Sequence, residues 1–200
     1  GRLAASPPKD GGTVQPAYGD RKGEGVANAV FTSEPFGEPT YIAGSTALSV
    51  TVETASPDVL VIGDLFDVAP DGTETRITRG NLVGSMRTPL PAREWRASGM
   101  LVRPGHDFSK TAVVVPNRPM DLDVSLQPRL ALLDKGHRLR LVIKARSDAV
   151  TRDCHFQLGP YPCLIGTLPQ QRAIINSTYT VRLGGKLALP LIAEPTAGTQ

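Results

Sequence analysis

Short apolar runs separated by turn residues follow one another from about residue 28 onward. Between residues 120 and 127, apolar and polar side chains alternate strictly, as Met120-Asp121-Leu122-Asp123-Val124-Ser125-Leu126-Gln127. This two-residue period predicts a strand with one buried face, whose charged face looks at water or at another protein surface. The same alternation predicts strands over 48–53 and 136–144, the second with Leu139, Leu141 and Ile143 pointing inward.

A hairpin is predicted around Pro70-Asp71-Gly72. Two apolar runs, 59–62 and 65–68, precede this tripeptide, and residues 73–78 follow it. Proline presets φ, aspartate can bond its own backbone, and glycine tolerates positive φ, so each of the three residues favours a turn for a physical reason. The segment 73–78 is expected to pair back on the preceding run.

The whole pattern predicts an all-β chain. Segments 173–183 and 187–192 bring the candidate strands to about nine or ten, and the weak helical candidate, 92–98, is too short to define the class. The chain has 20 glycines and 18 prolines among 200 residues, which suits a turn-rich protein. We predict an antiparallel β-sandwich of the jelly-roll class over residues 28–192, with a linker or arm over 1–27 and a tail over 193–200.

The charge and hydrophobicity of the chain exclude some classes of partner. The formal net charge is +3, with no block of like charges and no basic surface interleaved with aromatic residues, so nucleic acid is not an expected partner. No apolar stretch approaches the length of a membrane helix and the start does not resemble a secretory leader, so we expect a soluble chain with no membrane partner. The chain begins Gly1-Arg2-Leu3, which suggests an excised domain or processed fragment.

The two cysteines, Cys154 and Cys163, are separated by a loop rich in glycine and proline. A disulfide between them would stabilise the fold by ~2.7 kcal/mol in the chain-entropy model. It would also imply export, so a secreted or cell-envelope location is expected, with a cytoplasmic one left open. The alternative is two reduced cysteines, one of them buried.

The search for catalytic motifs is negative. The chain lacks the Gly-x-Ser-x-Gly pentapeptide of α/β-hydrolases, and its nearest fragments, around Ser45 and Ser85, are interpreted as loop serines between strands. His106-Asp107-Phe108-Ser109 contains all three side-chain types of a triad, but four consecutive loop residues rarely converge as a triad must. We interpret this segment as a turn held by hydrogen bonds, and we expect no catalytic residue in the chain.

Neither a metal site nor a cofactor is expected. Four carboxylates cluster in sequence, at Asp64, Asp67, Asp71 and Glu74, but the hydrophobic residues between them suit a strand entering a hairpin better than a calcium loop. The cysteines and His155 supply three ligands without the spacing of a known zinc cluster.

Two aromatic residues are candidates for ligand or interface contact. Trp95 is the single tryptophan and is flanked by Arg93, Glu94 and Arg96. If exposed, its ring could stack on a sugar or anchor a protein interface, and the alternative is an indole packed in the core or against a hairpin. Tyr161 could supply a second stacking ring, so carbohydrate remains a possible partner.

The order of the strand and turn motifs resembles one known family. The segments that carry the resemblance are 31–36, 41–44, 48–50, 64–72, 77–80 and 136–141, the best of them being Asp67-Val68-Ala69-Pro70-Asp71-Gly72 and Gly136-His137-Arg138-Leu139-Arg140-Leu141. Together they resemble the C-terminal, non-catalytic domain of X-Pro dipeptidyl-peptidases and cocaine-esterase-like (CocE/NonD) acyl hydrolases, over residues 28–192. The Cys154–Cys163 loop departs from the family's usual ending.

The resemblance implies a galactose-binding-like jelly roll attached to a catalytic α/β-hydrolase domain that this chain lacks. The expected function is that of an accessory domain, which packs on the catalytic domain of the same polypeptide and shapes substrate access. The parent is expected to be a serine hydrolase, a dipeptidyl-peptidase or an esterase. For His137 and Arg138 we expect structural hydrogen bonding at the start of a strand. The rival interpretation is a module that binds carbohydrate or another protein.

Overall fold

A computed structural model of the chain describes residues 13–14, 28–145 and 178–193. One ten-stranded antiparallel sheet contains most of them, and it folds into two layers, which we call the first and the second sheet. The first sheet has the order β1-β10-β3-β8, and β11 and β12 also pair with β3. Its strands are β1 (Thr13–Val14), β3 (Thr40–Thr54), β8 (Met120–Leu133), β10 (Tyr179–Arg182), β11 (Lys186–Ala188) and β12 (Leu191–Ala193). Residues Thr13 and Val14, inside the predicted arm, thus pair with β10.

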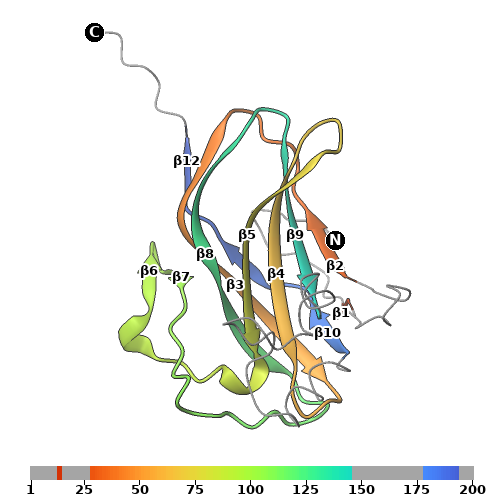
Figure 1. Cartoon of the computed structure of the whole chain (residues 1–200), viewed down its shortest axis with the longest axis vertical. Helices are drawn as coiled ribbons and strands as arrows, with labels where there is room; N and C mark the ends of the chain where they lie inside the picture. The colour runs from red at the N-terminus through yellow and green to blue at the C-terminus, as the bar shows by residue number, and fades with distance from the viewer. Residues whose placement is uncertain (1–12, 15–27, 146–177, 194–200) are drawn as a thin grey trace, which may run out of the picture.

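The second sheet has the order β5-β4-β9-β2. Its strands are β2 (Ala29–Thr32), β4 (Leu60–Val68), β5 (Glu74–Val83) and β9 (Arg138–Lys144). Strands far apart in sequence lie side by side in both sheets, with β9 between β2 and β4, and β3 between β10 and β8 (Figure 1). The predicted all-β sandwich of the jelly-roll class is confirmed, because no described segment forms an α-helix and every strand pair is antiparallel.

The two sheets meet at one close contact between β5 and β8. Gly80 pairs with Leu126, and a Cβ atom at Gly80 would lie 2.1 Å from the carbonyl oxygen of Ser125. Only glycine lets the two backbones approach this closely. This contact turns one sheet into the other and closes one side of the sandwich.

The core lies between the sheets and is filled by alternate residues of their strands. Leu139, Leu141 and Ile143 of β9 are buried there, as the alternation predicted. Most of the other large side chains that solvent does not reach come from β3, β4 and β8, and they include Leu48, Val52, Val61, Leu65, Leu122 and Leu126. Burial of this apolar surface is the main force that holds the sheets together.

The hairpin between β4 and β5 has the predicted turn. Gly72 has a φ of +88°, and the backbone N–H of Thr73 donates to the Asp71 carboxylate at 2.9 Å. This hydrogen bond lowers the pKa of Asp71 from its ordinary value. The two apolar runs predicted before the turn form one continuous strand, with a bulge between Leu65 and Phe66.

Two local predictions were wrong. The helical candidate 92–98 is the end of a 3-10 turn followed by a short strand, because the chain there pairs in a hairpin. Ser45 lies inside the 15-residue strand β3, at a bulge beside Gly44, where we expected a loop between strands. Pairing with β8, which is distant in sequence, keeps β3 continuous across Gly44.

Candidate functional surface

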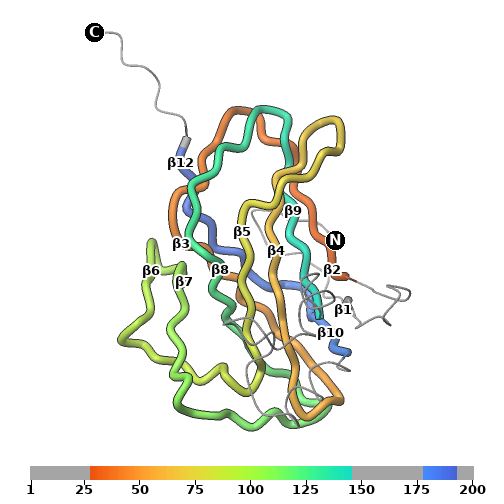
Figure 2. The backbone as a smooth tube through the Cα atoms, viewed as in Figure 1, coloured from red at the N-terminus to blue at the C-terminus, as the bar shows by residue number. Residues whose placement is uncertain are grey.

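A long connection between β5 and β8 is not part of the two sheets of the sandwich but packs beside them. We call residues 84–119 the β5–β8 excursion. It contains the 3-10 turns η1 (Gly84–Met86) and η2 (Pro91–Arg93) and a hairpin of β6 (Trp95–Ala97) with β7 (Met100–Arg103). The trace leaves the end of β5, forms the hairpin at one side of the molecule and returns beneath the sandwich to β8 (Figure 2).

Hydrogen bonds fix the base of this excursion. The Arg87 guanidinium donates to the carbonyl oxygens of Gly84 at 2.8 Å, Ala112 at 3.2 Å and Val113 at 2.9 Å, which ties its two ends together. The buried Asp58 carboxylate accepts from the Ser85 hydroxyl at 2.6 Å and from its N–H at 3.0 Å. Ser85 therefore anchors η1 to the sandwich.

The middle of the excursion is packed as closely as its base. A Cβ atom at Gly105 would lie 2.5 Å from the Leu90 carbonyl oxygen. The backbone that follows β7 therefore packs closely against the residue that precedes η2. The N–H of Leu90 donates to the Gly105 carbonyl at 2.8 Å, and that of Asp107 donates to Thr88 at 2.9 Å. The excursion therefore has a defined shape.

Large apolar side chains of this ordered segment face solvent. Trp95 is 59 % exposed, Phe108 67 % and Val113 76 %, and Met100 and Val115 are also exposed. The Arg103 guanidinium lies 4.8 Å from the centre of the Trp95 ring, a cation–π contact that covers one face of the indole. Trp95 is thus an exposed hairpin residue with an arginine stacked on it.

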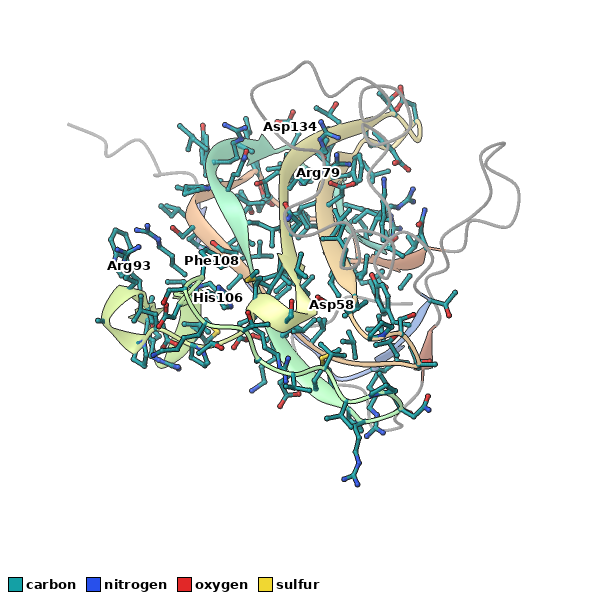
Figure 3. All side chains as sticks on the ribbon, turned by 60° about the horizontal axis from the view of Figure 1, so that its bottom comes forward. Asp58, Arg79, Arg93, His106, Phe108 and Asp134 are labelled. Atoms are coloured by element: carbon teal, nitrogen blue, oxygen red, sulfur yellow. The ribbon has the colours of Figure 1, made fainter. Side chains whose placement is uncertain are left out.

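The segment His106–Ser109 is a turn, as predicted. The Asp107 carboxylate accepts from the Ser109 hydroxyl at 2.5 Å and from its N–H at 3.1 Å, and bonds from Ser109 and Lys110 lower the Asp107 pKa. The His106 ring instead stacks on Phe108, with centroids 5.8 Å apart, and burial lowers its pKa. Arg93, His106 and Phe108 lie together at one side of the molecule (Figure 3).

A buried ion cluster lies on the second sheet. Asp64 of β4 is 0 % exposed and binds Arg79 of β5 in a two-pronged contact, with one of its bonds at 2.7 Å. The Lys144 ammonium lies 3.0 Å from the same carboxylate. Burial alone would raise the pKa of Asp64, but hydrogen bonds and charges from Arg79 and Lys144 outweigh it, and the pKa is lowered.

The other predicted carboxylates have separate partners. Asp67 bonds His137 Nδ1 at 2.8 Å, Asp71 caps its turn, and Glu74 pairs with Arg140. Because these groups bind different partners, they form no shared calcium shell, and no three metal-ligating side chains cluster within the described ranges. His137 and Arg138 have the structural role we expected, with Arg138 donating to the Ser33 carbonyl at 3.0 Å.

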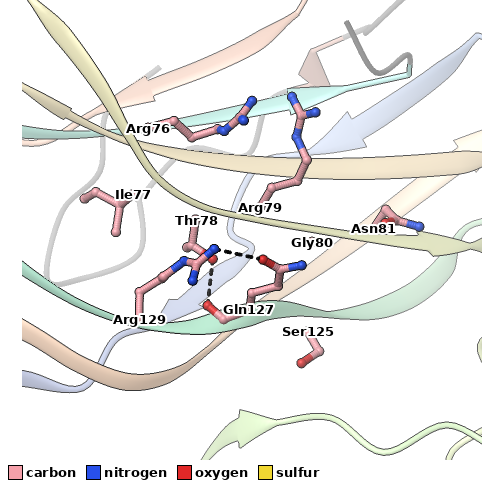
Figure 4. Close-up of a pocket in the computed structure, with 9 residues that line it drawn as sticks. All are labelled: Arg76, Ile77, Thr78, Arg79, Gly80, Asn81, Ser125, Gln127 and Arg129. Carbon is pink, nitrogen blue, oxygen red and sulfur yellow. Dashed lines mark hydrogen bonds between the residues drawn. The ribbon is translucent and has the colours of Figure 1, made fainter. Parts of the chain in front are cut away.

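The cavity between β5 and β8 does not form a reactive site. It has a volume of about 670 Å³ and its lining is mostly polar: Arg76, Ile77, Thr78, Arg79, Gly80, Asn81, Ser125, Gln127 and Arg129. Arg76 and Arg79 extend to one side of β5, away from Arg129, which bonds Gln127 at 3.2 Å (Figure 4). The guanidinium groups therefore do not converge on one point, and none of the lining residues is a histidine, a cysteine or an acid.

Some predictions fall on residues outside the described ranges. Cys154, Cys163 and Tyr161 are among them, so the disulfide, the export that it implies and the role of Tyr161 stay predictions. Within the described ranges, no helix is long and apolar enough to cross a bilayer.

Sequence reasoning missed two features of the site. It did not single out the exposed Met100, Val113 and Val115, because an apolar residue in a loop gives no sign of whether it is covered. It also missed the ion cluster, although a lone Asp64 within an apolar strand, opposite Arg79 across a predicted hairpin, was an available signal.

Comparisons with known proteins identify the family to which this fold belongs. The model of the X-Pro dipeptidyl-peptidase C-terminal non-catalytic domain matches residues 5–152. Two proteins named as serine esterases, from Mycobacterium bovis and Mycobacterium tuberculosis, are each 30 % identical over 172 residues, covering 83 % of this chain and 25 % of their own length. The chain thus spans about a quarter of these relatives.

Solved structures show the same fold. A CocE/NonD family hydrolase from Staphylococcus aureus superposes with a TM-score of 0.72 at 16 % identity, over 96 % of this chain and 34 % of that one. An α-amino acid ester hydrolase gives a TM-score of 0.56 at 16 % identity, over 88 % of this chain and 28 % of that one. From the match over residues 5–152, the chain belongs to the family of X-Pro dipeptidyl-peptidase C-terminal non-catalytic domains.

Proposed function

We propose that this chain is the accessory domain of a serine hydrolase of the dipeptidyl-peptidase or acyl-esterase type. In this role it packs on an α/β-hydrolase catalytic domain of the same polypeptide and shapes the path by which substrate enters. The observation that carries the proposal is that the chain corresponds to only about a quarter of proteins named as serine esterases, within a family described as non-catalytic.

The side chains support a role without chemistry of its own. The described serine and histidine residues that could suggest a triad bond elsewhere: Ser85 to Asp58, Ser109 to Asp107, and His137 to Asp67. A nucleophile needs a base within hydrogen-bond reach, and these pairs use carboxylates as structural acceptors.

The test compares this chain with the longer polypeptide that contains it. The purified chain should show no turnover of activated acyl esters or X-Pro chromogenic dipeptides above the blank, whereas the longer polypeptide should hydrolyse one of these classes. Deleting the chain from the longer polypeptide should change KM for bulky substrates more than for small ones. Turnover by the chain alone that Ser109→Ala abolishes would defeat the proposal.

A second candidate is a carbohydrate-binding module that uses Trp95. The exposure of this ring favours it, but Arg103 covers one face, so a sugar could stack on the other face only. Micromolar binding on a glycan array, lost in Trp95→Ala, is the result that would favour this candidate over the accessory domain.

A further inference from the structure

Exposed apolar residues gather on one short part of the chain. Of the ten large hydrophobic side chains exposed among the described residues, five belong to the β5–β8 excursion, which has only 36 residues: Trp95, Met100, Phe108, Val113 and Val115. Burying such residues releases water and is favourable, so an ordered surface that keeps them exposed is suited to a partner.

The kinds of residue distinguish this surface from the second exposed apolar group. That group, Leu130, Leu132, Leu191 and Ile192, is aliphatic and lies along β8 and β12. The excursion instead combines the single tryptophan with Phe108, Met100 and several arginines, the residue types enriched where proteins bind one another.

The excursion also carries the net positive charge of the chain. It contains six lysines and arginines against two acidic residues, a net charge of +4, so the remaining residues together carry −1. A segment that combines exposed apolar residues with this excess of positive charge complements a partner surface that carries apolar residues and carboxylates.

Contacts within this domain fix the conformation of the excursion before a partner binds. The three carbonyl bonds of Arg87, the Ser85–Asp58 pair and the close approach at Gly105 hold it before any partner arrives. A preorganised surface avoids much of the entropy loss that ordering a loop on binding would cost.

We infer that the β5–β8 excursion is the surface on which the catalytic domain of the same polypeptide docks. The inference rests on the proposed function. About three quarters of the length of the related esterases lies outside the match to this chain, so a large domain is tethered close by and its effective concentration is high. The interface places Trp95, Phe108 and Val113 against that domain, and the aliphatic group on β8 and β12 lies outside it.

Hydrogen exchange followed by mass spectrometry tests the location. Amide exchange is compared between this chain alone and the longer polypeptide. Peptides within residues 84–119 should exchange at least about tenfold more slowly in the longer polypeptide. Peptides containing Leu130–Leu133 or Leu191–Ala193 should change little, and 0.5 M NaCl should weaken the protection because charge contributes to docking.

A matched pair of variants in the longer polypeptide tests the residues. Val113→Ser and Leu130→Ser replace side chains that are 76 % and 75 % exposed, so neither should disturb the fold of this domain. Val113→Ser combined with Phe108→Ser should return exchange within 84–119 to the rate of the isolated chain, and Leu130→Ser should leave the protection intact.

The outcomes separate this inference from the proposed function. Protection of the β8 and β12 group, with Leu130→Ser removing it, overturns the docking surface but leaves an accessory domain. A longer polypeptide without hydrolase activity and without any protection overturns both. Protection that grows with the concentration of the isolated chain identifies a second copy as the occupant, and it too overturns the inference.

Discussion

The second sheet buries a charged side chain, whereas the β5–β8 excursion exposes apolar side chains. On the sheet, Asp64 is buried and its charge is balanced by Arg79 and Lys144. On the excursion, Trp95 and Phe108 are exposed although the backbone beneath them is well bonded. Folding alone accounts for buried charges that have partners, whereas a group of ordered apolar residues exposed to water is suited to contact with a partner.

The largest expected loss of stability comes from a substitution in the core, and it is compared with the same substitution at the surface. Leu65→Ala removes a fully buried side chain of the core and should lower the free energy of unfolding by about 3 kcal/mol, through lost burial and the cavity left behind. Leu130→Ala makes the same chemical change at an exposed position and should cost less than about 0.5 kcal/mol. Urea unfolding followed by circular dichroism measures both, and equal losses would contradict the proposed core.

The ion cluster should give the next largest effect. Asp64→Asn removes the carboxylate that Arg79 and Lys144 share and should cost about 2 kcal/mol at pH 7, less than a wholly buried pair because both cations are partly hydrated. Asp134→Asn, at the exposed turn before β9, is the matched control and should be nearly neutral.

The same cluster predicts the acid dependence of stability. The pKa of Asp64 is lower in the folded than in the unfolded chain, so its contribution is complete above the unfolded pKa, about 3.9, and is lost as pH falls through the folded value. The difference in unfolding free energy between wild type and Asp64→Asn should therefore shrink below about pH 4. A difference that stays constant down to pH 2 would rule out this explanation.

The His137–Asp67 pair should contribute less. His137→Ala removes one side-chain hydrogen bond at the start of β9 and should destabilise the fold by about 1 kcal/mol. A double-mutant cycle with Asp67→Ala should give a coupling energy of similar size. If His137 is structural, the kcat of the longer polypeptide survives the change once the protein is folded, and a loss of about a thousandfold in kcat would contradict that role.

The sandwich could be predicted because its strands alternate. Leu139, Leu141 and Ile143 are inward, and the Pro70-Asp71-Gly72 turn has the expected geometry, because both depend on local rules of side-chain direction and φ. The excursion could not be predicted in the same way. Val113, Val114 and Val115 form one apolar run, yet Val114 is buried and its neighbours are exposed, which depends on distant contacts with η1.

The site was predicted only in part for the same reason. Trp95 was a candidate because it is the single tryptophan, but its exposure and its arginine partner come from the β6–β7 register, which pairs Trp95 with Arg103. The ion cluster likewise needs β4, β5 and β9 to be neighbours, and β9 is distant in sequence. Local patterns specify the strands, and long-range pairing decides which charges meet.

The smallest expected effect concerns the hairpin that carries Trp95. Arg103→Ala removes the cation–π contact and should cost only about 0.5 kcal/mol, because the pair is exposed. It should also uncover the second face of the indole, so acrylamide, a neutral quencher, should quench the fluorescence of the single tryptophan more strongly than in wild type. Arg118→Ala, at an exposed arginine of the same excursion, should leave quenching unchanged. If quenching is the same in all three proteins, Arg103 does not cover the ring in solution, and both faces of Trp95 are open to a partner.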